Sequence, residues 1–262
     1  MELIDTHCHL DFPVFDADRE ALLTRWRQLG VGEYIIPALG EENWGRVMAL
    51  AGRHDGIRYG LGIHPWYVGK QPRDALTRLE TLLASRPRGL VAVGECGLDL
   101  RSHVPQEGQV EMFEAQVRLA MAHELPLIVH SVRANDTVAK ILRRFTPPQG
   151  GVIHAFSGSL RQAEVFWQLG FRLGIGGVIS YERANKTREA IRQMPLEALL
   201  LETDAPDMPL QGQQGEVNTP ASLPTIARLL AQLRQQPLED VISVLHDSTR
   251  RLFPPGNHEI NI

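Results

Sequence analysis

Two kinds of segment, which differ in the spacing of their apolar residues, alternate along the chain. Short apolar runs, such as residues 151–153 and 171–175, have the length of buried strands. Between these runs lie longer segments in which apolar positions recur every three or four residues. Near-continuous apolar strands separated by amphipathic helices are typical of a parallel sheet covered by helices. The pattern therefore predicts an α/β protein.

Eight strand–helix units follow one another in this way. The first strand begins at Leu3, and the later strands are predicted at residues 34–39, 58–63, 89–93, 125–129, 151–153, 171–175 and 199–201. The helices are predicted at residues 16–30, 42–53, 73–85, 107–124, 135–145, 160–170, 183–194 and 220–252. Eight units in 262 residues favour a closed (β/α)8 barrel, the TIM barrel. A doubly wound open sheet is the alternative, but no glycine-rich phosphate-binding loop follows the first strand.

The barrel is predicted to form one domain. No linker or low-complexity segment interrupts residues 1–253, and residues 254–262 have the composition of a loose tail. Late glycines such as Gly174, Gly176 and Gly177 lack the spacing of a dinucleotide-binding motif, so we expect them to serve close packing or a tight turn.

Composition narrows the class of protein only slightly. The chain is 43% hydrophobic and 22% charged, as ordinary soluble globular proteins are. The net charge of −4 predicts no basic coat for wrapping nucleic acid, although it leaves room for a local positive groove or a metal site. Two cysteines, Cys8 and Cys96, argue for a reducing compartment rather than a disulfide framework. With no visible signal peptide or transmembrane segment, we expect a cytoplasmic protein with no membrane contact and no obligate protein partner.

Candidate chemistry begins with two histidines near the N-terminus. His7 and His9 are separated by one residue and follow the apolar start of the first strand. On a strand, alternate side chains share a face, so both imidazoles are expected to project the same way while Cys8 points back. Two imidazoles on one face form half of a site for a transition metal.

Further ionisable residues end the later strands. They are His64, Glu95, His130, His154 and Asp204. Barrel active sites lie at the C-terminal ends of the strands, so these side chains are expected to meet at one mouth. Leaving His64 aside, four imidazoles and two carboxylates are enough ligands for two metal ions, and Glu95 is the best placed to bridge them.

Each of these residues also has a purely structural interpretation. One histidine at a strand end is commonly a satisfied structural residue, but so many ionisable groups at one mouth would destabilise the fold without a partner. Cys8 and Cys96 are expected to be small core residues rather than ligands. Surface positions are the default for the other histidines and for the arginines near the mouth, although any of these arginines could meet a phosphate: His54, His103, His123, His246, His258, Arg101, Arg133, Arg161 and Arg183.

Five sequence blocks carry a resemblance to a known family. The blocks are residues 5–11, 62–65, 94–99, 154–158 and 202–207, with the sequences DTHCHLD, GIHP, GECGLD, HAFSG and ETDAPD. They resemble the signature blocks of the TatD family, metal-dependent hydrolases with a TIM-barrel fold that are related to the amidohydrolases. The blocks follow the family order from the first strand to the eighth, so the resemblance covers nearly the whole chain.

The resemblance implies a role for each residue of the site. His7, His9 and Asp204 would hold one metal ion, His130 and His154 the second, and Glu95 would bridge both. His64 would contact the substrate or support the ligands. Family members characterised as nucleases hydrolyse phosphodiester bonds, many of them as DNases that act from the 3′ end.

One position departs from the family. The family often has arginine two residues after the fifth-strand histidine, where this chain has Val132. Arginine follows one position later, at Arg133, which is therefore the candidate for a substrate contact in that loop.

The hypothesis is a metal-dependent hydrolase of phosphoester bonds, a TatD-type deoxyribonuclease. Its cofactors would be two divalent ions (Zn²⁺, Mg²⁺ or Mn²⁺), and its substrate DNA or another phosphoester. Two ions can activate a water molecule and stabilise an in-line displacement at phosphorus. Asp204 would orient that water or take its proton, Glu95 would join the ions, and the metals or His64 would stabilise the leaving oxygen.

Two rival hypotheses remain. The first keeps the metals but cleaves a lactone, an amide or a cyclic imide, as amidohydrolase relatives do. Many of those use a carboxylated lysine as the bridge, whereas Glu95 stands in that place here. The second is a metal-bound scaffold without enzymatic activity.

Overall fold

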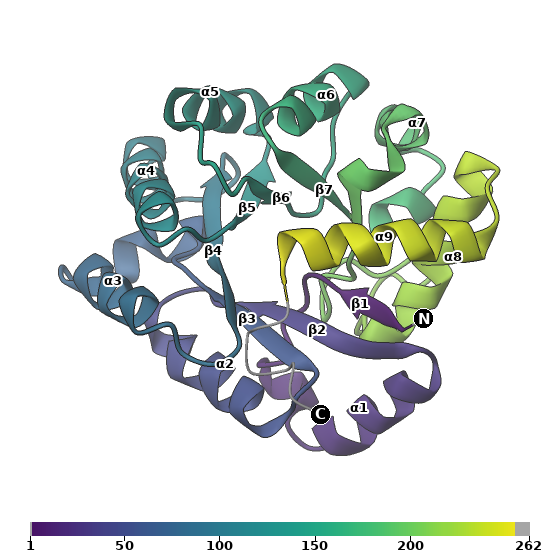
Figure 1. Ribbon diagram of the computed structural model, residues 1–262, viewed down its shortest axis with the longest axis horizontal. Coiled ribbons are helices and arrows are strands. Elements are labelled where there is room, and N and C mark those ends of the chain that lie inside the picture. The colour runs from purple at the N-terminus through teal and green to yellow at the C-terminus, as the bar shows by residue number, and fades with distance from the viewer. Residues whose placement is uncertain (1, 255–262) are drawn as a thin grey trace.

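A computed structural model describes residues 2–254 and shows a ring of parallel strands surrounded by helices (Figure 1). The predicted barrel is confirmed: eight strands form one sheet in the order of the sequence, each paired in parallel with the next. The strands are β1 (Leu3–Asp5), β2 (Val31–Pro37), β3 (Ile57–Leu61), β4 (Leu90–Asp99), β5 (Leu127–Val132), β6 (Gly151–Ile153), β7 (Phe171–Ile175) and β8 (Leu199–Leu201).

The helices form the outer layer. They are α1 (Arg19–Gln28), α2 (Glu41–Arg53), α3 (Ala75–Ser85), α4 (Gln106–Ala122), α5 (Asn135–Phe145), α6 (Leu160–Gln168), α7 (Asn185–Gln193), α8 (Leu223–Arg234) and α9 (Leu238–Leu252). The single helical segment predicted at residues 220–252 is therefore two helices. The break lies where Gln235 adopts a left-handed conformation and Pro237 directly precedes the next helix, because proline lacks the backbone N–H that would continue the first.

Hydrogen bonds from Thr6, which directly follows β1, to the end of β8 close the barrel. The backbone N–H and the hydroxyl of Thr6 both donate to the carbonyl of Leu201, at 3.0 and 2.9 Å. The two outermost strands of the sheet order, β1 and β8, are thereby brought together at their C-terminal ends.

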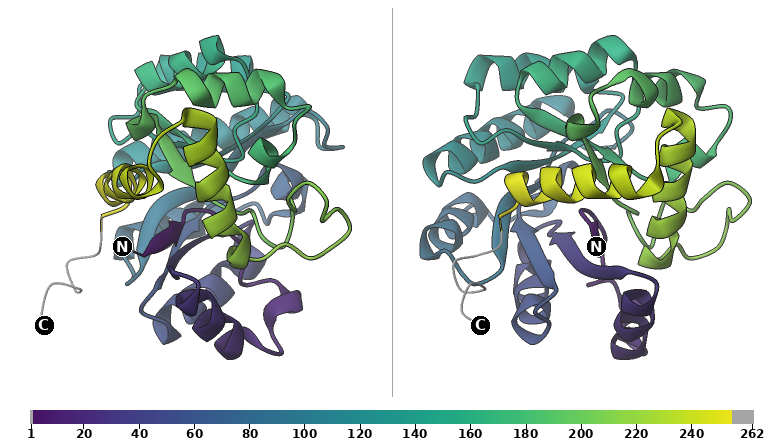
Figure 2. Two further views of the ribbon diagram at one scale, coloured as in Figure 1. Left: turned by 90° about the vertical axis from the view of Figure 1, so that its right-hand side faces the viewer. Right: turned by 45° about the vertical axis from the view of Figure 1, so that its right-hand side comes forward.

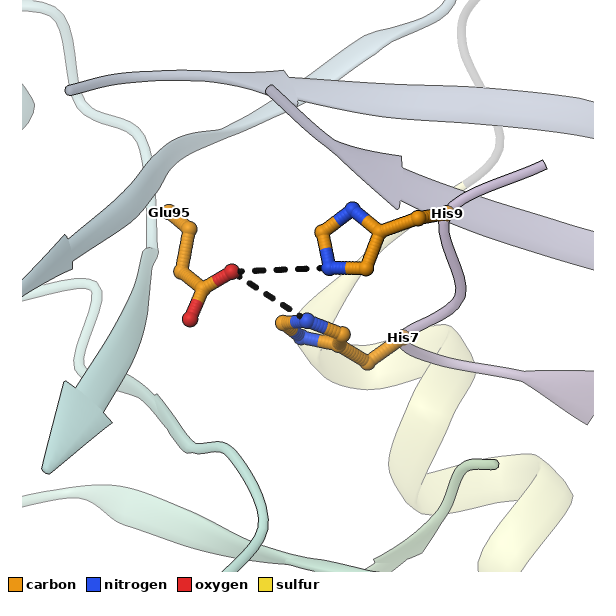
Figure 3. A group of neighbouring side chains, drawn as sticks. All are labelled: His7, His9 and Glu95. Carbon is orange, nitrogen blue, oxygen red and sulfur yellow. Dashed lines mark ion pairs between the residues drawn. The ribbon is translucent and has the colours of Figure 1, made fainter. Parts of the chain in front are cut away.

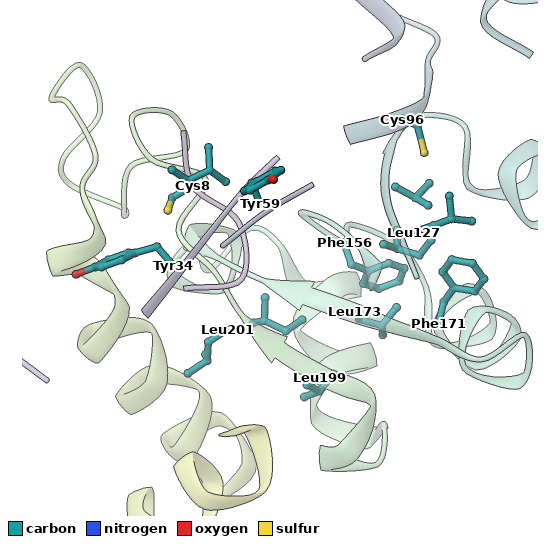
Figure 4. Packing of buried hydrophobic residues seen from close by; sticks show 14 of the residues in the cluster. Cys8, Tyr34, Tyr59, Cys96, Leu127, Phe156, Phe171, Leu173, Leu199 and Leu201 are labelled. Carbon is teal, nitrogen blue, oxygen red and sulfur yellow. The ribbon is translucent and has the colours of Figure 1, made fainter. Parts of the chain in front are cut away.

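Apolar side chains fill two layers. A large cluster lies between the strands and the helices, and Cys8 and Cys96 are buried within it, as expected (Figure 4). A second cluster inside the barrel ends at Leu252, the last residue of α9, and at Phe253, which comes directly after the helix. That helix crosses one end of the barrel, whereas the long loop after β8 extends from the opposite end (Figure 2, left). One end of the barrel is thus closed by packing, and the site lies at the other.

Two further expectations concern the C-terminal tail and membrane contact. Residues 255–262 of the predicted tail lie beyond the described part of the chain. Among the described helices, none has the length and apolar character needed to cross a membrane.

Candidate metal centre

Glu95 lies at the centre of the side chains that the sequence predicted to meet. It is 2% exposed, and its Oε2 atom lies 3.3 Å from His7 Nε2 and 3.8 Å from His9 Nε2 (Figure 3). Asp204 approaches the same two histidines, with its Oδ1 3.6 Å from His7 Nε2 and 3.7 Å from His9 Nε2. Two imidazoles and two carboxylates thus form one group of possible ligands.

The other oxygen of Glu95 faces a second group. Oε1 lies 2.8 Å from His130 Nδ1 and 3.6 Å from the Nε2 atoms of His154 and His64. The structure therefore brings together all seven residues of the predicted centre. The six residues other than Glu95 lie in two groups, one on each side of its carboxylate.

The expected position of His7 and His9 on the first strand is wrong. The strand β1 ends at Asp5, because Thr6 turns toward β8 while the Cys8 N–H donates to the carbonyl of Ile35 on β2. The two histidines lie on an irregular segment between these neighbours. Their imidazoles still face Glu95 together, so the alternation rule placed the side chains correctly for an incorrect reason.

The expected end of the fourth strand at Glu95 is also wrong. The strand β4 continues to Asp99, and its register with β5 shifts between Val93 and Cys96. Gly94 lies in this irregular part with φ +154°, and a Cβ there would come 2.6 Å from the carbonyl oxygen of Ile128. Glycine is therefore needed for the shift that turns Glu95 into the mouth.

Two further carboxylates, to which the sequence assigned no role, support the histidines. Asp99 Oδ2 lies 3.3 Å from His130 Nε2, and Glu202 Oε1 lies 3.2 Å from His154 Nδ1. A carboxylate on the far nitrogen of a metal-binding histidine fixes the tautomer and the ring orientation. Their positions in the sequence could have pointed to them: Asp99 lies four residues after Glu95, and Glu202 lies two residues before Asp204.

Asp5 joins the first and last strands beneath this layer. Its carboxylate accepts hydrogen bonds from the Thr203 hydroxyl at 2.6 Å, the Thr203 N–H at 3.0 Å and the His7 N–H at 3.3 Å. Burial raises the pKa of Asp5 to about 8, and these hydrogen bonds act in the opposite direction. The residue positions the backbone next to His7.

The pKa values of the two carboxylates at the centre are shifted in opposite directions. Burial would raise the pKa of Glu95, but His64, His7, His154 and His130 together hold it well below its usual range. Burial raises the pKa of Asp204 to about 6, although His154 and His9 oppose it.

The histidines on the two sides of Glu95 differ as well. Burial, together with His154, holds the pKa of His7 well below its ordinary value. For His154, burial acts downward, but Asp204, Glu202 and Glu95 raise its pKa to about 10. For His130, burial also acts downward, while the hydrogen bonds to Asp99 and Glu95 raise its pKa.

His64 is placed as a hydrogen-bond donor. Its Nδ1 accepts the backbone N–H of Trp66 at 3.1 Å, and burial lowers its pKa to about 3. The neutral ring then carries its proton on Nε2, the atom that faces Glu95. A protonated nitrogen offers no lone pair to a metal, so His64 suits a substrate contact better than ligation.

The donor set fits divalent metal ions. Both ring nitrogens of His7 are buried and find no hydrogen-bond partner among residues 2–254. The nearest atoms from His7, His9 and Glu95 lie within 4.8 Å of one another. Imidazole and carboxylate ligands suit zinc and other transition ions. The residues could therefore hold metal on either side of Glu95.

The remaining candidates lie apart from this centre. Arg133 is exposed, with a left-handed backbone, three residues beyond His130. Within residues 2–254 it takes no part in the hydrogen bonds and ion pairs around Glu95. The histidines predicted at the surface are exposed or partly exposed wherever they are described; they are His54, His103, His123 and His246.

A (β/α)8 barrel whose mouth gathers histidines and carboxylates around a buried glutamate has the architecture of a metal-dependent hydrolase. The sequence model of the family described as TatD related DNase matches residues 4–254. The chain belongs to the TatD family and is one of its metal-dependent hydrolases.

Relatives agree over the full length of the chain. An Escherichia coli K12 protein named uncharacterized metal-dependent hydrolase YjjV is 47% identical over 251 residues, which are 95% of this chain and 97% of the relative. The crystal structure of E. coli YjjV superposes with a TM-score of 0.93 over 96% of this chain and 97% of that one, at 47% identity. A Pantoea protein named 3′-5′ ssDNA/RNA exonuclease TatD is 32% identical over 260 residues, covering 96% of this chain and 99% of the relative.

Proposed function

We propose that this protein is a phosphodiesterase that hydrolyses nucleic acid with two divalent ions held at the barrel mouth. The observation that carries the proposal is the division of ligands between the two oxygens of Glu95, with His7 and His9 facing Oε2 and His130 facing Oε1. One carboxylate shared by two groups of nitrogen ligands is an arrangement that suits a pair of ions.

The residues proposed to hold the ions are those that the family resemblance implies, and the distances are compatible with that division. His7, His9 and Asp204 would hold one, His130 and His154 the other, and Glu95 would join them. Bound Zn²⁺, Mg²⁺ or Mn²⁺ supplies positive charge to phosphoryl oxygens and lowers the pKa of a water molecule.

Asp204 is proposed to orient the attacking water and receive its proton. Its side chain is 17% exposed, against 2% for Glu95, so it is the carboxylate of this centre that meets solvent at the mouth. A general base must lie within hydrogen-bond reach of the group it deprotonates, and the open side of Asp204 meets that condition.

His64 is proposed to act on the opposite side of the phosphate. Its Nε2–H would donate to the leaving oxygen, because Trp66 occupies Nδ1. The exposed guanidinium of Arg133 would contact the substrate at the end of β5. The Pantoea relative, named as an exonuclease of single-stranded DNA and RNA, supports such strands as the substrate class.

The test combines metal analysis with an activity screen. We expect about two ions per chain, and hydrolysis of single-stranded DNA and of bis(p-nitrophenyl) phosphate with added Mg²⁺, Mn²⁺ or Zn²⁺. Glu95→Gln should bind less metal and lose turnover, whereas His103→Ala, a substitution at an exposed histidine, should behave as the unaltered protein. Turnover of a lactone or a dihydropyrimidine without any metal-dependent phosphoester hydrolysis would favour the amidohydrolase alternative and contradict the proposal.

A further inference from the structure

A basic cavity lies beside the barrel mouth, between three neighbouring helices. Its volume is about 470 Å³, and it is lined by one side of α5, by the first turns of α6 and by the start of α7. The lining residues that matter most are Asn135, Arg143, Arg161, Gln162 and Lys186.

The cations of this cavity have no acidic partner in the described part of the chain. Arg143, Arg161 and Lys186 are exposed, and no ion pair involves them within residues 2–254. The acidic residue lining the cavity, Asp136, accepts a hydrogen bond from Gln162 at 3.0 Å. Three positive charges against one negative charge leave the cavity basic in a protein whose net charge is −4.

Neighbouring arginines show a different pattern. Arg144 pairs with Glu114, although it is adjacent in sequence to Arg143. Arg192 on α7 pairs with Glu189 at 2.6 Å. The charges around the cavity therefore remain available to an anion, whereas Arg144 and Arg192 are already paired.

Hydrogen bonds connect the cavity wall to the strands that carry the second group of ligands. The Oδ1 atom of Asn135 accepts from the Ser131 hydroxyl at 2.7 Å, and its Nδ2 donates to the Ser157 carbonyl at 3.0 Å. Ser131 directly follows His130, and Ser157 comes three residues after His154. The cavity thus adjoins the His130 and His154 side of the mouth.

We propose that this cavity binds a backbone phosphate of a nucleic-acid strand whose scissile phosphate lies at the metal centre, which rests on the function proposed above. Guanidinium and ammonium groups bind phosphate through charge-assisted hydrogen bonds, and the starts of α5, α6 and α7 add their positive dipole ends. A nucleic-acid strand presents phosphates at regular intervals, so one bound at the centre places others on the rim. The cavity would therefore favour polynucleotides over small phosphodiesters.

The test compares two substrates. For R161Q/K186Q, we expect the ratio of kcat/KM on a short single-stranded DNA oligonucleotide to that on bis(p-nitrophenyl) phosphate to fall about tenfold, mainly through KM. The slope of log(kcat/KM) for the oligonucleotide against log[salt] should become shallower by about 0.7 for each phosphate that the altered cavity no longer binds. The matched control is R183Q, since Arg183 is exposed, packs on the Tyr181 ring and does not line the cavity.

Equal ratios and slopes for R161Q/K186Q and R183Q would overturn the proposal. If inorganic phosphate inhibits the unaltered protein more strongly than R161Q/K186Q while the oligonucleotide ratio is unchanged, the cavity holds a free anion and the assignment to a nucleic-acid backbone is wrong. If the unaltered protein cleaves no phosphodiester with any metal, the proposed function fails by itself. In that case, the fluorescence anisotropy of a labelled oligonucleotide with the unaltered protein, R161Q/K186Q and R183Q tests separately whether the cavity binds nucleic acid.

Discussion

Gly174 on β7 offers the most direct test of how the second group of ligands is oriented. A Cβ at this position would lie 2.1 Å from Glu202 Oε2 and 2.5 Å from Glu202 Cδ. Glu202 is completely buried, so its carboxylate has little space into which it could retreat. We expect Gly174→Ala to displace Glu202 from His154.

The expected magnitude follows from what Glu202 contacts. Its Oε1 atom accepts the Ala155 N–H at 2.6 Å and lies 3.2 Å from His154 Nδ1. Loss of a carboxylate that orients a metal-binding histidine typically lowers metal affinity 10- to 100-fold, or about 1.4–2.7 kcal/mol. Overpacking a buried position adds about 1–3 kcal/mol of destabilisation.

Gly176→Ala is the matched control. It lies two residues further along the same segment, but its nearest contact for an added Cβ is the Glu202 carbonyl oxygen at 3.4 Å. Metal affinity would be measured by competition with a chromogenic chelator, and urea unfolding of the metal-free proteins would separate affinity from stability. If Gly174→Ala binds both ions as tightly as Gly176→Ala, the inferred role of Glu202 is refuted.

Further predictions concern groups around and far from the centre. Trp66→Phe removes the indole N–H that donates to Asp99 Oδ2 at 2.7 Å, so metal affinity should fall by about 1 kcal/mol in the same competition assay; unchanged affinity would count against a role for Trp66 in orienting Asp99. Arg58→Met should lower the free energy of unfolding by about 3 kcal/mol, because the 3% exposed guanidinium pairs with Glu33 at 3.2 Å and donates to the Phe253 carbonyl at 2.7 Å. Arg88→Met breaks an exposed ion pair with Asp55 and should change the free energy of unfolding by less than about 0.5 kcal/mol. Similar urea midpoints for Arg58→Met and Arg88→Met would contradict the reasoning.

The sequence was most informative where an apolar run was short and its ends were sharply marked. The strands β6, β7 and β8 and the helix α5 have the predicted bounds. Glycine or histidine brackets β6 and β7 on both sides, and Glu202 marks the end of β8. The ends of β1 and β4 were wrong because partners distant in sequence determine them. Thr6 turns toward Leu201, and the shift after Val93 depends on contact with Ile128.

The residues that form the site could be predicted from the sequence, but the orientation of their histidine rings could not. Ionisable residues at strand ends must converge in a parallel barrel, so the seven residues of the centre follow from topology. Which nitrogen of each ring faces Glu95 depends on the group at the other nitrogen. Asp99, Glu202 and the Trp66 N–H take those positions, and only the folded structure brings them to His130, His154 and His64.

The two sides of Glu95 are built unequally. On the Oε1 side, His130 and His154 each have a carboxylate at the nitrogen that faces away from the centre. On the Oε2 side, the Nδ1 atoms of His7 and His9 have no ion pair with a carboxylate in residues 2–254. Like His154 Nδ1, they are buried without a hydrogen bond, but Glu202 Oε1 lies 3.2 Å from the His154 atom. A carboxylate at that position raises the basicity of a ligand and limits its rotation. We therefore infer that the rings of His130 and His154 are held more firmly in orientation than those of His7 and His9, whereas Asp204 gives the Oε2 side one more ligand.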